Sequence, residues 1–152
     1  DGLVLINSSF KNFSGIFQRL QTEALMHLYK AMTAHSPVSR EREILDMVSN
    51  LPAEQKNKIA PKWAEIAAER PVSAMNFLKQ LGAAAIYEAP PHKPKVPVLV
   101  LTSEADNMVS FRCSKTIARQ WETDIEIHET AGHEMALDAQ DWVIEKLFKY
   151  FK

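Results

Sequence analysis

Three short apolar runs stand apart from the amphipathic pattern of the remaining chain. They occupy residues 2–7, 97–102 and 125–128, and each is followed at once by a polar loop. Near-continuous apolar runs of this length are typical of parallel strands that are buried on both faces of a sheet. The pattern therefore predicts three parallel strands.

Helical periodicity fills most of the chain between and after these runs. Apolar residues recur at three- and four-residue spacing, which predicts helices over 16–34, 40–50, 53–69, 72–89, 110–121 and 139–150. Pro61 is expected either to kink its helix or to mark that helix's first turn. Gly82 and the alanines that follow it predict close packing of their helix against a sheet. The alternation of strands and helices predicts one α/β domain over residues 1–152.

Residues 10–70 form a helical block between the first two predicted strands. A crossover between parallel strands needs only about a dozen residues, so this block is long enough to be an insertion that covers a site. The alternative is an ordinary helical layer without a gating role. Its methionines, Met26, Met32 and Met47, are predicted to fill the core and not to form a binding surface.

The start of the chain has the character of an interior strand. The apolar run begins directly after Asp1, which is not an initiator methionine. An interior strand needs a neighbour on each side, so we expect that the chain begins within a domain, as a fragment, a processed piece or a cut polypeptide. The exposed edge of residues 2–7 is then expected to pair with the missing half of the domain or with a second copy.

Charge and cysteine content exclude several classes of function. A net charge of -1 and a pI near 6.6 provide no field that would attract nucleic acid or an anionic membrane. No apolar run approaches the ~18 residues of a membrane span, and no signal peptide is visible, so the default prediction is a cytoplasmic protein. Cys113 is the one cysteine. We predict a buried structural thiol, with a reactive thiol as the alternative.

Two of the polar loops carry candidate catalytic groups. The loop after the second strand contains Asp106, and the loop after the third contains His133. The carboxyl ends of neighbouring parallel strands meet at one edge of a sheet, where ligands bind in open α/β folds. A carboxylate and an imidazole placed there are candidates for the orienting acid and the base of a nucleophilic triad.

These loops resemble those of a known fold family. The segment PVLVL followed by SEADNMV resembles the acid loop of α/β-hydrolases, and AGHEM followed by Asp138 and Trp142 resembles their histidine loop and final helix. Residues 2–8 resemble the strand that follows the nucleophile helix. The resemblance covers essentially the whole chain. It implies the C-terminal half of an α/β-hydrolase, with three parallel strands, flanking helices and the helical block as a cap.

The resemblance also implies roles for the two loop residues. Asp106 would orient His133 through a ring N–H, and His133 would take the proton of a serine and pass it to the leaving group. Glu104 is the competing acid. The structural alternatives are a turn carboxylate for Asp106 and a loop histidine bound to backbone for His133. Gly132 is expected to permit the tight turn that aims the ring.

The other histidines carry no comparable motif. His27, His35, His92 and His128 are predicted to be structural or solvated. A metal site built from His128 and His133 with Glu129 or Glu134 is disfavoured, because neither pair has the helical spacing of zinc-binding histidines. The resemblance requires no metal or cofactor.

One part of the family pattern is absent from this sequence. The nucleophile elbow G-x-S-x-G needs two glycines four apart, but the glycines stand at positions 2, 15, 82 and 132. Ser8, Ser9 and Ser14 are poor substitutes, since a strained elbow is what exposes the attacking oxygen. The isolated chain is therefore expected to be inactive in serine-type acyl transfer.

Two hypotheses from different classes follow. The first is the C-terminal part of a serine-type hydrolase of carboxylic esters or similar small acyl substrates, needing no cofactor. The second is a non-catalytic module that self-associates through the strand at residues 2–7. The same scaffold also hosts epoxide, haloalkane, peptide and C–C bond hydrolysis, and these reactions differ mainly at the nucleophile.

Overall fold

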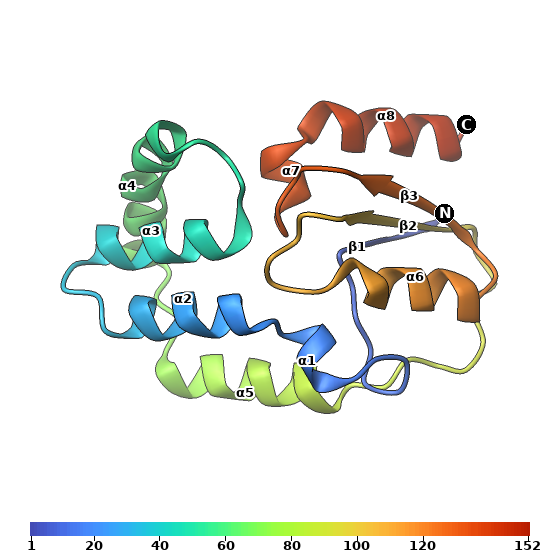
Figure 1. Ribbon diagram of the computed structural model, residues 1–152, viewed down its shortest axis with the longest axis horizontal. Coiled ribbons are helices and arrows are strands. Elements are labelled where there is room, and N and C mark those ends of the chain that lie inside the picture. The colour runs from blue at the N-terminus through green and yellow to red at the C-terminus, as the bar shows by residue number, and fades with distance from the viewer.

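A three-stranded parallel sheet forms the centre of the computed structural model (Figure 1), which describes residues 1–152 except for the side chain of residue 74. The strands are β1 (Leu3–Ile6), β2 (Val98–Ser103) and β3 (Asp124–His128), in the spatial order β1-β2-β3. All pairings are parallel. The prediction of a parallel α/β sheet is confirmed.

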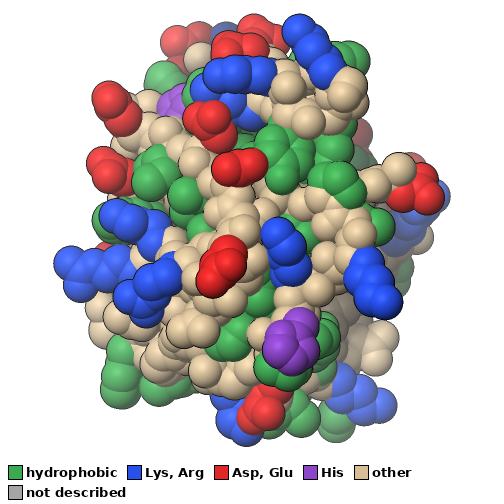
Figure 2. All heavy atoms as spheres, turned by 90° about the vertical axis from the view of Figure 1, so that its right-hand side faces the viewer, with side chains coloured by type: hydrophobic (Ala, Val, Ile, Leu, Met, Phe, Trp, Pro, Cys, Tyr) green, Lys and Arg blue, Asp and Glu red, His purple; other side chains and the backbone are tan. Residues whose placement is uncertain are grey.

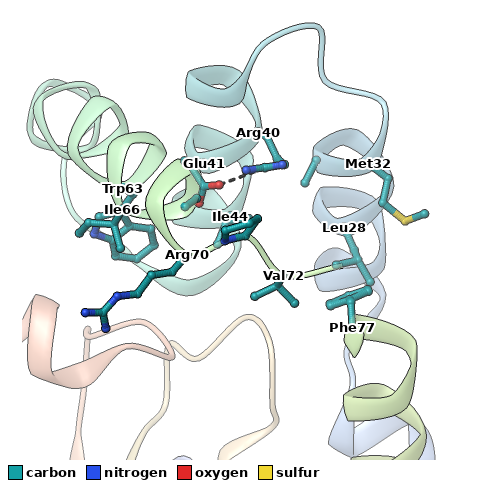
Figure 3. Close-up of a pocket in the computed structure, with 13 residues that line it drawn as sticks. Leu28, Met32, Arg40, Glu41, Ile44, Trp63, Ile66, Arg70, Val72 and Phe77 are labelled. Carbon is teal, nitrogen blue, oxygen red and sulfur yellow. Dashed lines mark hydrogen bonds and ion pairs between the residues drawn. The ribbon is translucent and has the colours of Figure 1, made fainter. Parts of the chain in front are cut away.

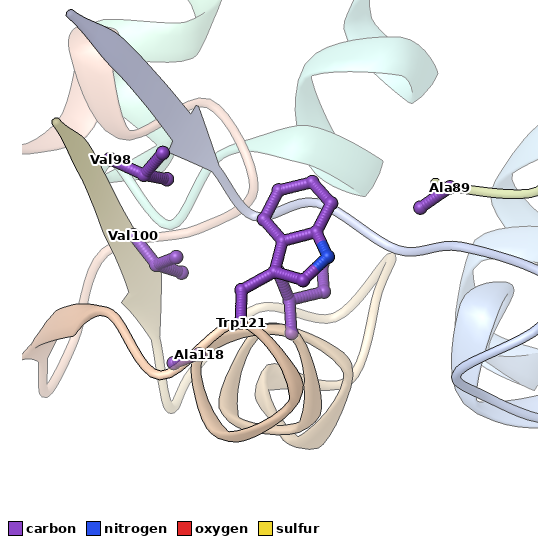
Figure 4. Close-up of a cluster of buried hydrophobic side chains, with 6 residues drawn as sticks. Ala89, Val98, Val100, Ala118 and Trp121 are labelled. Carbon is purple, nitrogen blue, oxygen red and sulfur yellow. The ribbon is translucent and has the colours of Figure 1, made fainter. Parts of the chain in front are cut away.

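β2 is the central strand, and its side chains alternate between two cores. Val98 and Val100 face α6 (Phe111–Gln120) and pack with Ala118 and Trp121 (Figure 4). Leu99 and Leu101 face the opposite side, where α7 (Met135–Asp138) and α8 (Gln140–Tyr150) cover the sheet. Every residue of β2 is buried. The apolar run therefore forms a strand because it supplies both faces of a layered fold at once.

Trp121 completes the hydrophobic core between α6 and the sheet. The residue is 5% exposed, and its ring lies 5.6 Å from the ring of Phe10 and 6.3 Å from that of Phe13. The indole N–H donates to the carbonyl of Pro90 at 3.2 Å. One side chain thus attaches to the sheet both the loop after β1 and the proline-rich segment at residues 90–95 that leads toward β2.

β1 lies at the edge of the sheet formed by this chain. It pairs with β2 from Leu3 opposite Val98 to Ile6 opposite Leu101. Its residues are only partly buried, and Ile6 is 37% exposed. The predicted neighbour on the other side of β1 is not among the described strands, so an interior position for this strand stays a prediction.

The helices between β1 and β2 lie beside the carboxyl ends of the strands (Figure 1). They are α1 (Ile16–Arg19), α2 (Thr22–Met32), α3 (Pro37–Val48), α4 (Ala53–Glu69) and α5 (Ala74–Ile86). α2 packs on α3, and α3 packs on α4. We call the segment from residue 10 to residue 70 the helical block. Its position places it over the edge of the sheet where the two polar loops emerge.

The first helix of the block was predicted wrongly as one element over 16–34. The helix breaks at Leu20 and Gln21, where the backbone is extended. The backbone N–H of Gln21 donates to the carbonyl of Met108 at 2.9 Å, and its side-chain amide donates to the carbonyl of Asp106 at 2.6 Å. We call the loop between β2 and α6, residues 104–110, the acid loop. Hydrogen bonds to this loop therefore replace the helical bonds that apolar periodicity alone would favour.

Two other helix predictions are corrected by local chemistry. α3 begins at Pro37 and not near residue 40, because Ser36 caps it by accepting from the N–H of Ser39 at 3.1 Å and proline is tolerated in the first turn. Pro61 lies inside α4, which starts at Ala53, so the first-turn interpretation of this proline is wrong.

A partly buried ion cluster joins α3 to α4. Lys56 donates to the carboxylate of Asp46 at 2.8 Å, and Arg42 donates to it at 3.1 Å. Burial raises the pKa of Asp46, but the hydrogen bonds from Lys56 and Arg42 outweigh it and hold that pKa below its ordinary value. The cluster therefore keeps a charged carboxylate between the two helices.

The packing predicted for α5 is wrong. Met75, Leu78 and Ile86 are each at least 59% exposed, and a Cβ added at Gly82 would meet no other atom within 4 Å. The sequence pattern identifies an apolar face but not what covers it, and in this chain the sheet does not cover this one.

The methionine prediction also fails in part. Met26 is 60% exposed and Met32 is 74% exposed, so neither fills a core, whereas Met47 is half-buried. Met26 and Met32 lie on α2, whose apolar stripe is wider than the surface that α3 covers.

The end of the molecule opposite the helical block has an ordinary charged surface. Lysine and arginine side chains are interspersed there with aspartate and glutamate (Figure 2), as expected from the small net charge. Within the described residues, none of the helices combines the length and the apolar character needed to cross a membrane.

The central position of β2 predicts a large effect of truncation. Leu101→Ala removes a side chain that is 0% exposed, and we expect it to lower the free energy of unfolding by about 3 kcal/mol through lost burial and a residual cavity. Leu78→Ala, on the exposed face of α5, should change it by about 0.5 kcal/mol or less. Urea unfolding of both variants measures the difference, and equal destabilisation would contradict the assigned core.

Candidate active site

Asp106 and His133 meet at the carboxyl edge of the sheet. Asp106 Oδ2 lies 2.9 Å from Nδ1 of His133. The side chain of Asp106 is 0% exposed, and that of His133 is 25% exposed. The carboxylate is thus enclosed, while the imidazole is partly exposed to solvent. The structure brings together the two residues that the sequence singled out.

The acid loop fixes its carboxylate through its own backbone. Asp106 Oδ1 accepts from the N–H of Met108 at 2.8 Å and from the N–H of Val109 at 3.0 Å. This is the turn geometry that aspartate favours, because its short side chain reaches the amides two and three residues ahead. The other oxygen is left to face His133. The polar loop that follows β2 therefore presents a preorganised acceptor.

The pairing determines which ring nitrogen of His133 carries the proton. A carboxylate only accepts hydrogen bonds, so the Nδ1 atom that faces it must donate. In the neutral imidazole, Nε2 then keeps a lone pair and can take a proton from another group. An imidazole in this tautomer has the free lone pair that a general base requires.

We call the loop between β3 and α7, residues 129–134, the histidine loop. Asn7, at the end of β1, binds this loop, and its role was not predicted from the sequence. Its Nδ2 donates to the carbonyl of His133 at 2.7 Å and to that of Gly132 at 3.3 Å. Its Oδ1 accepts from Thr102 Oγ1 at 3.1 Å and from the N–H of Ser103 at 3.0 Å. The residue is 4% exposed and has a φ of 46°, a left-handed conformation that asparagine tolerates. The signal available in the sequence was an asparagine at the end of an apolar run.

Gly132 is required for a different reason from the one predicted. Its φ is not positive, so conformational freedom does not explain the glycine. A Cβ at this position would lie 2.7 Å from the carbonyl oxygen of Val48 and 2.9 Å from Cα of Ser49. The histidine loop therefore runs against the backbone at the end of α3, and only a residue without a side chain fits there.

Glu104, the competing acid, and His128 take no part in the contact between Asp106 and His133. Glu104 has an exposed side chain, and its contact in the sheet is its backbone N–H, which donates to the carbonyl of His128 at 2.9 Å. His128 Nδ1 accepts from the N–H groups of Thr130 and Ala131 at 3.2 Å and 3.0 Å, so it organises the turn before the catalytic candidate.

Two further predicted residues have structural surroundings. His27 pairs with Glu43 at 2.9 Å and links α2 to α3. Cys113 is 0% exposed, and burial raises the pKa of its thiol, which favours the structural interpretation over the reactive one. Within the described part of the chain, His, Cys, Asp and Glu side chains do not gather in the groups of three that could hold a metal ion.

A cleft of about 770 Å³ opens among the helices of the block and α5 (Figure 3). Its walls are mainly apolar, with Leu28, Ile44 and Trp63 among the lining residues. Glu41 enters it as a buried carboxylate paired with Arg40 at 3.0 Å, and Arg70 points away from the helices toward the loops below (Figure 3). The cleft can accept an apolar group of considerable size.

Comparisons of the sequence with protein-family models and with curated proteins find no match. Solved structures do match. The meta-cleavage product hydrolase CumD from Pseudomonas fluorescens IP01 gives a TM-score of 0.74 at 14% identity, over 99% of this chain and 55% of that chain. The esterase EaEST from Exiguobacterium antarcticum gives 0.72 at 15% identity, over 98% and 56% of the two chains. The chain has the α/β-hydrolase fold.

A third neighbour agrees with this assignment. The 2-hydroxy-6-oxo-6-phenylhexa-2,4-dienoate hydrolase BphD from Rhodococcus sp. strain RHA1 gives a TM-score of 0.68 at 16% identity, over 99% of this chain and 55% of that chain. The chain therefore spans about half the length of the α/β-hydrolase structures that it matches. The predicted fold, a partial α/β-hydrolase, is confirmed.

The close approach at Gly132 predicts opposite effects of two glycine substitutions. Gly132→Ala pushes a methyl group into backbone at 2.7 Å and should lower the free energy of unfolding by about 1–3 kcal/mol. Gly82→Ala, in an open helical position, should raise it by about 0.5–1 kcal/mol. Urea unfolding distinguishes the two, and a neutral Gly132→Ala would show that the loop is free to move away.

Proposed function

We propose that the chain is the part of a serine-type α/β-hydrolase that supplies the acid and the base of a catalytic triad. Asp106 orients His133, and His133 activates a serine that lies outside this chain. The substrates are carboxylic esters or similar small acyl compounds, and the reaction needs neither metal nor cofactor. The observation that supports this proposal most directly is the 2.9 Å contact between the enclosed carboxylate and the partly exposed imidazole.

The chemistry follows from the ring orientation. The lone pair of His133 Nε2 takes the serine proton as the serine oxygen attacks the acyl carbon, and the imidazolium then gives that proton to the departing alkoxide. Asp106 stabilises the imidazolium through Nδ1–H without itself becoming protonated. Water repeats the cycle to release the acid. Each step uses the side chains of Asp106 and His133, which lie 2.9 Å apart in the structure.

We assign the helical block to substrate binding as a cap. It lies over the edge of the sheet that carries Asp106 and His133 (Figure 1), and its cleft is mostly apolar. Apolar walls suit the hydrocarbon part of an acyl or alcohol group, since burial of such surface contributes about 25 cal/mol per Å². One of the matching structures is described as an esterase, which supports this choice of substrate class.

The remaining part of the hydrolase is proposed to pair with β1. The free edge of Leu3–Ile6 offers backbone hydrogen-bonding groups to another strand. α1, α2 and α5 also expose large apolar side chains, among them Phe17 at 81% and Ile86 at 70%. Either the preceding half of the protein or a second copy of this chain would cover these surfaces. A stable monomer in light scattering would contradict this part of the proposal.

The isolated chain should show no acyl-enzyme. With a short-chain aryl ester in excess, stopped-flow absorbance should detect no burst of phenol, because the sequence lacks a nucleophile elbow. A burst stoichiometric with the protein would sink the proposal that the serine lies elsewhere.

The native coding region upstream of Asp1 tests the proposal directly. We expect a G-x-S-x-G motif there, opening a helix that leads into β1. A start codon close to Asp1 with no such motif would instead favour the self-associating module that has lost catalysis.

In the protein that contains the serine, Asp106→Asn should reduce kcat for an aryl ester by roughly 10⁴-fold, because the amide can present an N–H to Nδ1 and favour the wrong tautomer. The matched control is Glu104→Gln, two residues away and exposed, which should change kcat by about twofold or less. Steady-state kinetics measures both. Similar losses in the two variants would contradict the assignment of the acid.

A further inference from the structure

One carboxylate binds the histidine loop and the helical block at the same time. Asp138, the last residue of α7, accepts at Oδ2 from the N–H of Gly132 at 2.7 Å and from the N–H of Asn50 at 2.7 Å. Its Oδ1 accepts from Ser49 Oγ at 2.5 Å. Hydrogen bonds to a charged acceptor are shorter and about twice as strong as neutral ones, and these three have that character.

The turn between α3 and α4 lies directly against the histidine loop. The carbonyl of Val48 accepts from the N–H of Glu134 at 2.8 Å. A Cβ on Gly132 would overlap this same carbonyl at 2.7 Å. Ser49 is 2% exposed. The end of α3 is therefore packed on the backbone on both sides of His133, with no space between them.

The same turn also contacts the acid loop. Asn50 Nδ2 donates to the carbonyl of Ala105 at 2.9 Å and to that of Thr130 at 3.1 Å. Its Oδ1 accepts from Asn107 Nδ2 at 3.2 Å. One side chain of the helical block thus touches residues on both sides of Asp106 and a residue of the histidine loop. We call residues 48–50 the clamp turn.

The histidine loop is consequently held from two directions. Asn7 binds the carbonyls of Gly132 and His133 from the sheet, and Asp138 binds the N–H of Gly132 while holding the clamp turn. The bond from Asn7 depends only on the sheet, whereas the bonds of Asp138 also depend on the position of the helical block. The orientation of the imidazole is therefore linked to the packing of that block.

We propose that Asp138 is a positioning residue that, together with Ser49 and Asn50 of the clamp turn, couples the helical block to the geometry of the Asp106–His133 pair. Asp138 acts through the backbone of Gly132 and touches neither the substrate nor the reacting atoms. This inference rests on the proposed function, because the pair it positions is the proposed acid and base. A displacement of about 1 Å in such a pair is enough to reduce catalysis by about 100-fold.

The test uses the full-length protein that contains the serine, with an aryl ester as substrate. Asp138→Asn keeps the shape of the side chain but removes its charge and one acceptor. It should lower kcat by about 10–100-fold with KM within about twofold, since positioning is lost and binding is not. Ser49→Ala, which alters only the clamp turn, should lower kcat by about 3–10-fold in the same manner. The control is Asp141→Asn, an exposed carboxylate in the first turn of α8, which should leave kcat unchanged.

A spectroscopic readout separates this inference from the proposed function. In protein labelled with ¹⁵N-histidine, the Nδ1–H proton of His133 should give an NMR signal that Asp138→Asn and Ser49→Ala weaken or shift, and that Asp141→Asn does not. If the unaltered protein hydrolyses no ester while this signal responds as expected, the proposed function fails and the coupling stands. An unchanged signal and kcat in folded Asp138→Asn would overturn the coupling, as would an effect of Asp138→Asn that Ser49→Ala does not share.

Discussion

The parallel pairing of β2 with β3 is the constraint on which the candidate site depends. Leu99 lies opposite Asp124 and Ser103 lies opposite His128, so the two strands end side by side. Because parallel strands deliver their following loops to the same edge, the acid loop and the histidine loop must emerge together. The contact between Asp106 and His133 is a consequence of that register. β2 is buried on both faces, and its side chains belong to both hydrophobic cores of the fold. This packing stabilises the register.

Around this edge, buried hydrogen-bonding side chains replace regular secondary structure. Asn7 links the end of β1 to both the end of β2 and the histidine loop. Ser103 Oγ donates to the carbonyl of Ala131 at 2.5 Å, and Gln21 binds the acid loop from the helical block. Loops that lie against one another need such partners, since an unpaired buried backbone group costs about as much as a lost hydrogen bond. The same bonds that stabilise the loops hold the catalytic candidates in place.

Much of the fold could be predicted from the sequence, because its information is local. The apolar run at residues 97–102 has the length of a strand and is shorter than a typical helix, and the loops that carry Asp106 and His133 follow such runs. The segment that covers each helix, in contrast, could not be predicted from the residues of that helix. The small residues of α5 suggested packing on a sheet, yet Leu78 and Ile86 are exposed. The prediction failed because the sequence of a helix does not specify which segment packs against it.

The parts of the site that sequence reasoning missed are contacts between distant segments. Gly132 has no unusual backbone conformation, and its requirement becomes clear only where the carbonyl of Val48 approaches it. Asn7 reads as the polar end of a strand, and the break at Gln21 reads as continuous helix. Their roles depend on segments about 85–125 residues away in the chain. No local periodicity encodes such distances.

His133 is proposed to activate a serine supplied from outside this chain. The most direct measurement is the reaction of the full-length protein with a 4-nitrophenyl phosphonate, followed by mass spectrometry of the modified peptide. We expect the phosphonate to attach to a serine that precedes Asp1, and His133→Ala to slow this attachment by at least about 1,000-fold. Modification at the same rate in His133→Ala would overturn the proposed role of His133, and modification of a residue within this chain would overturn the proposed position of the serine.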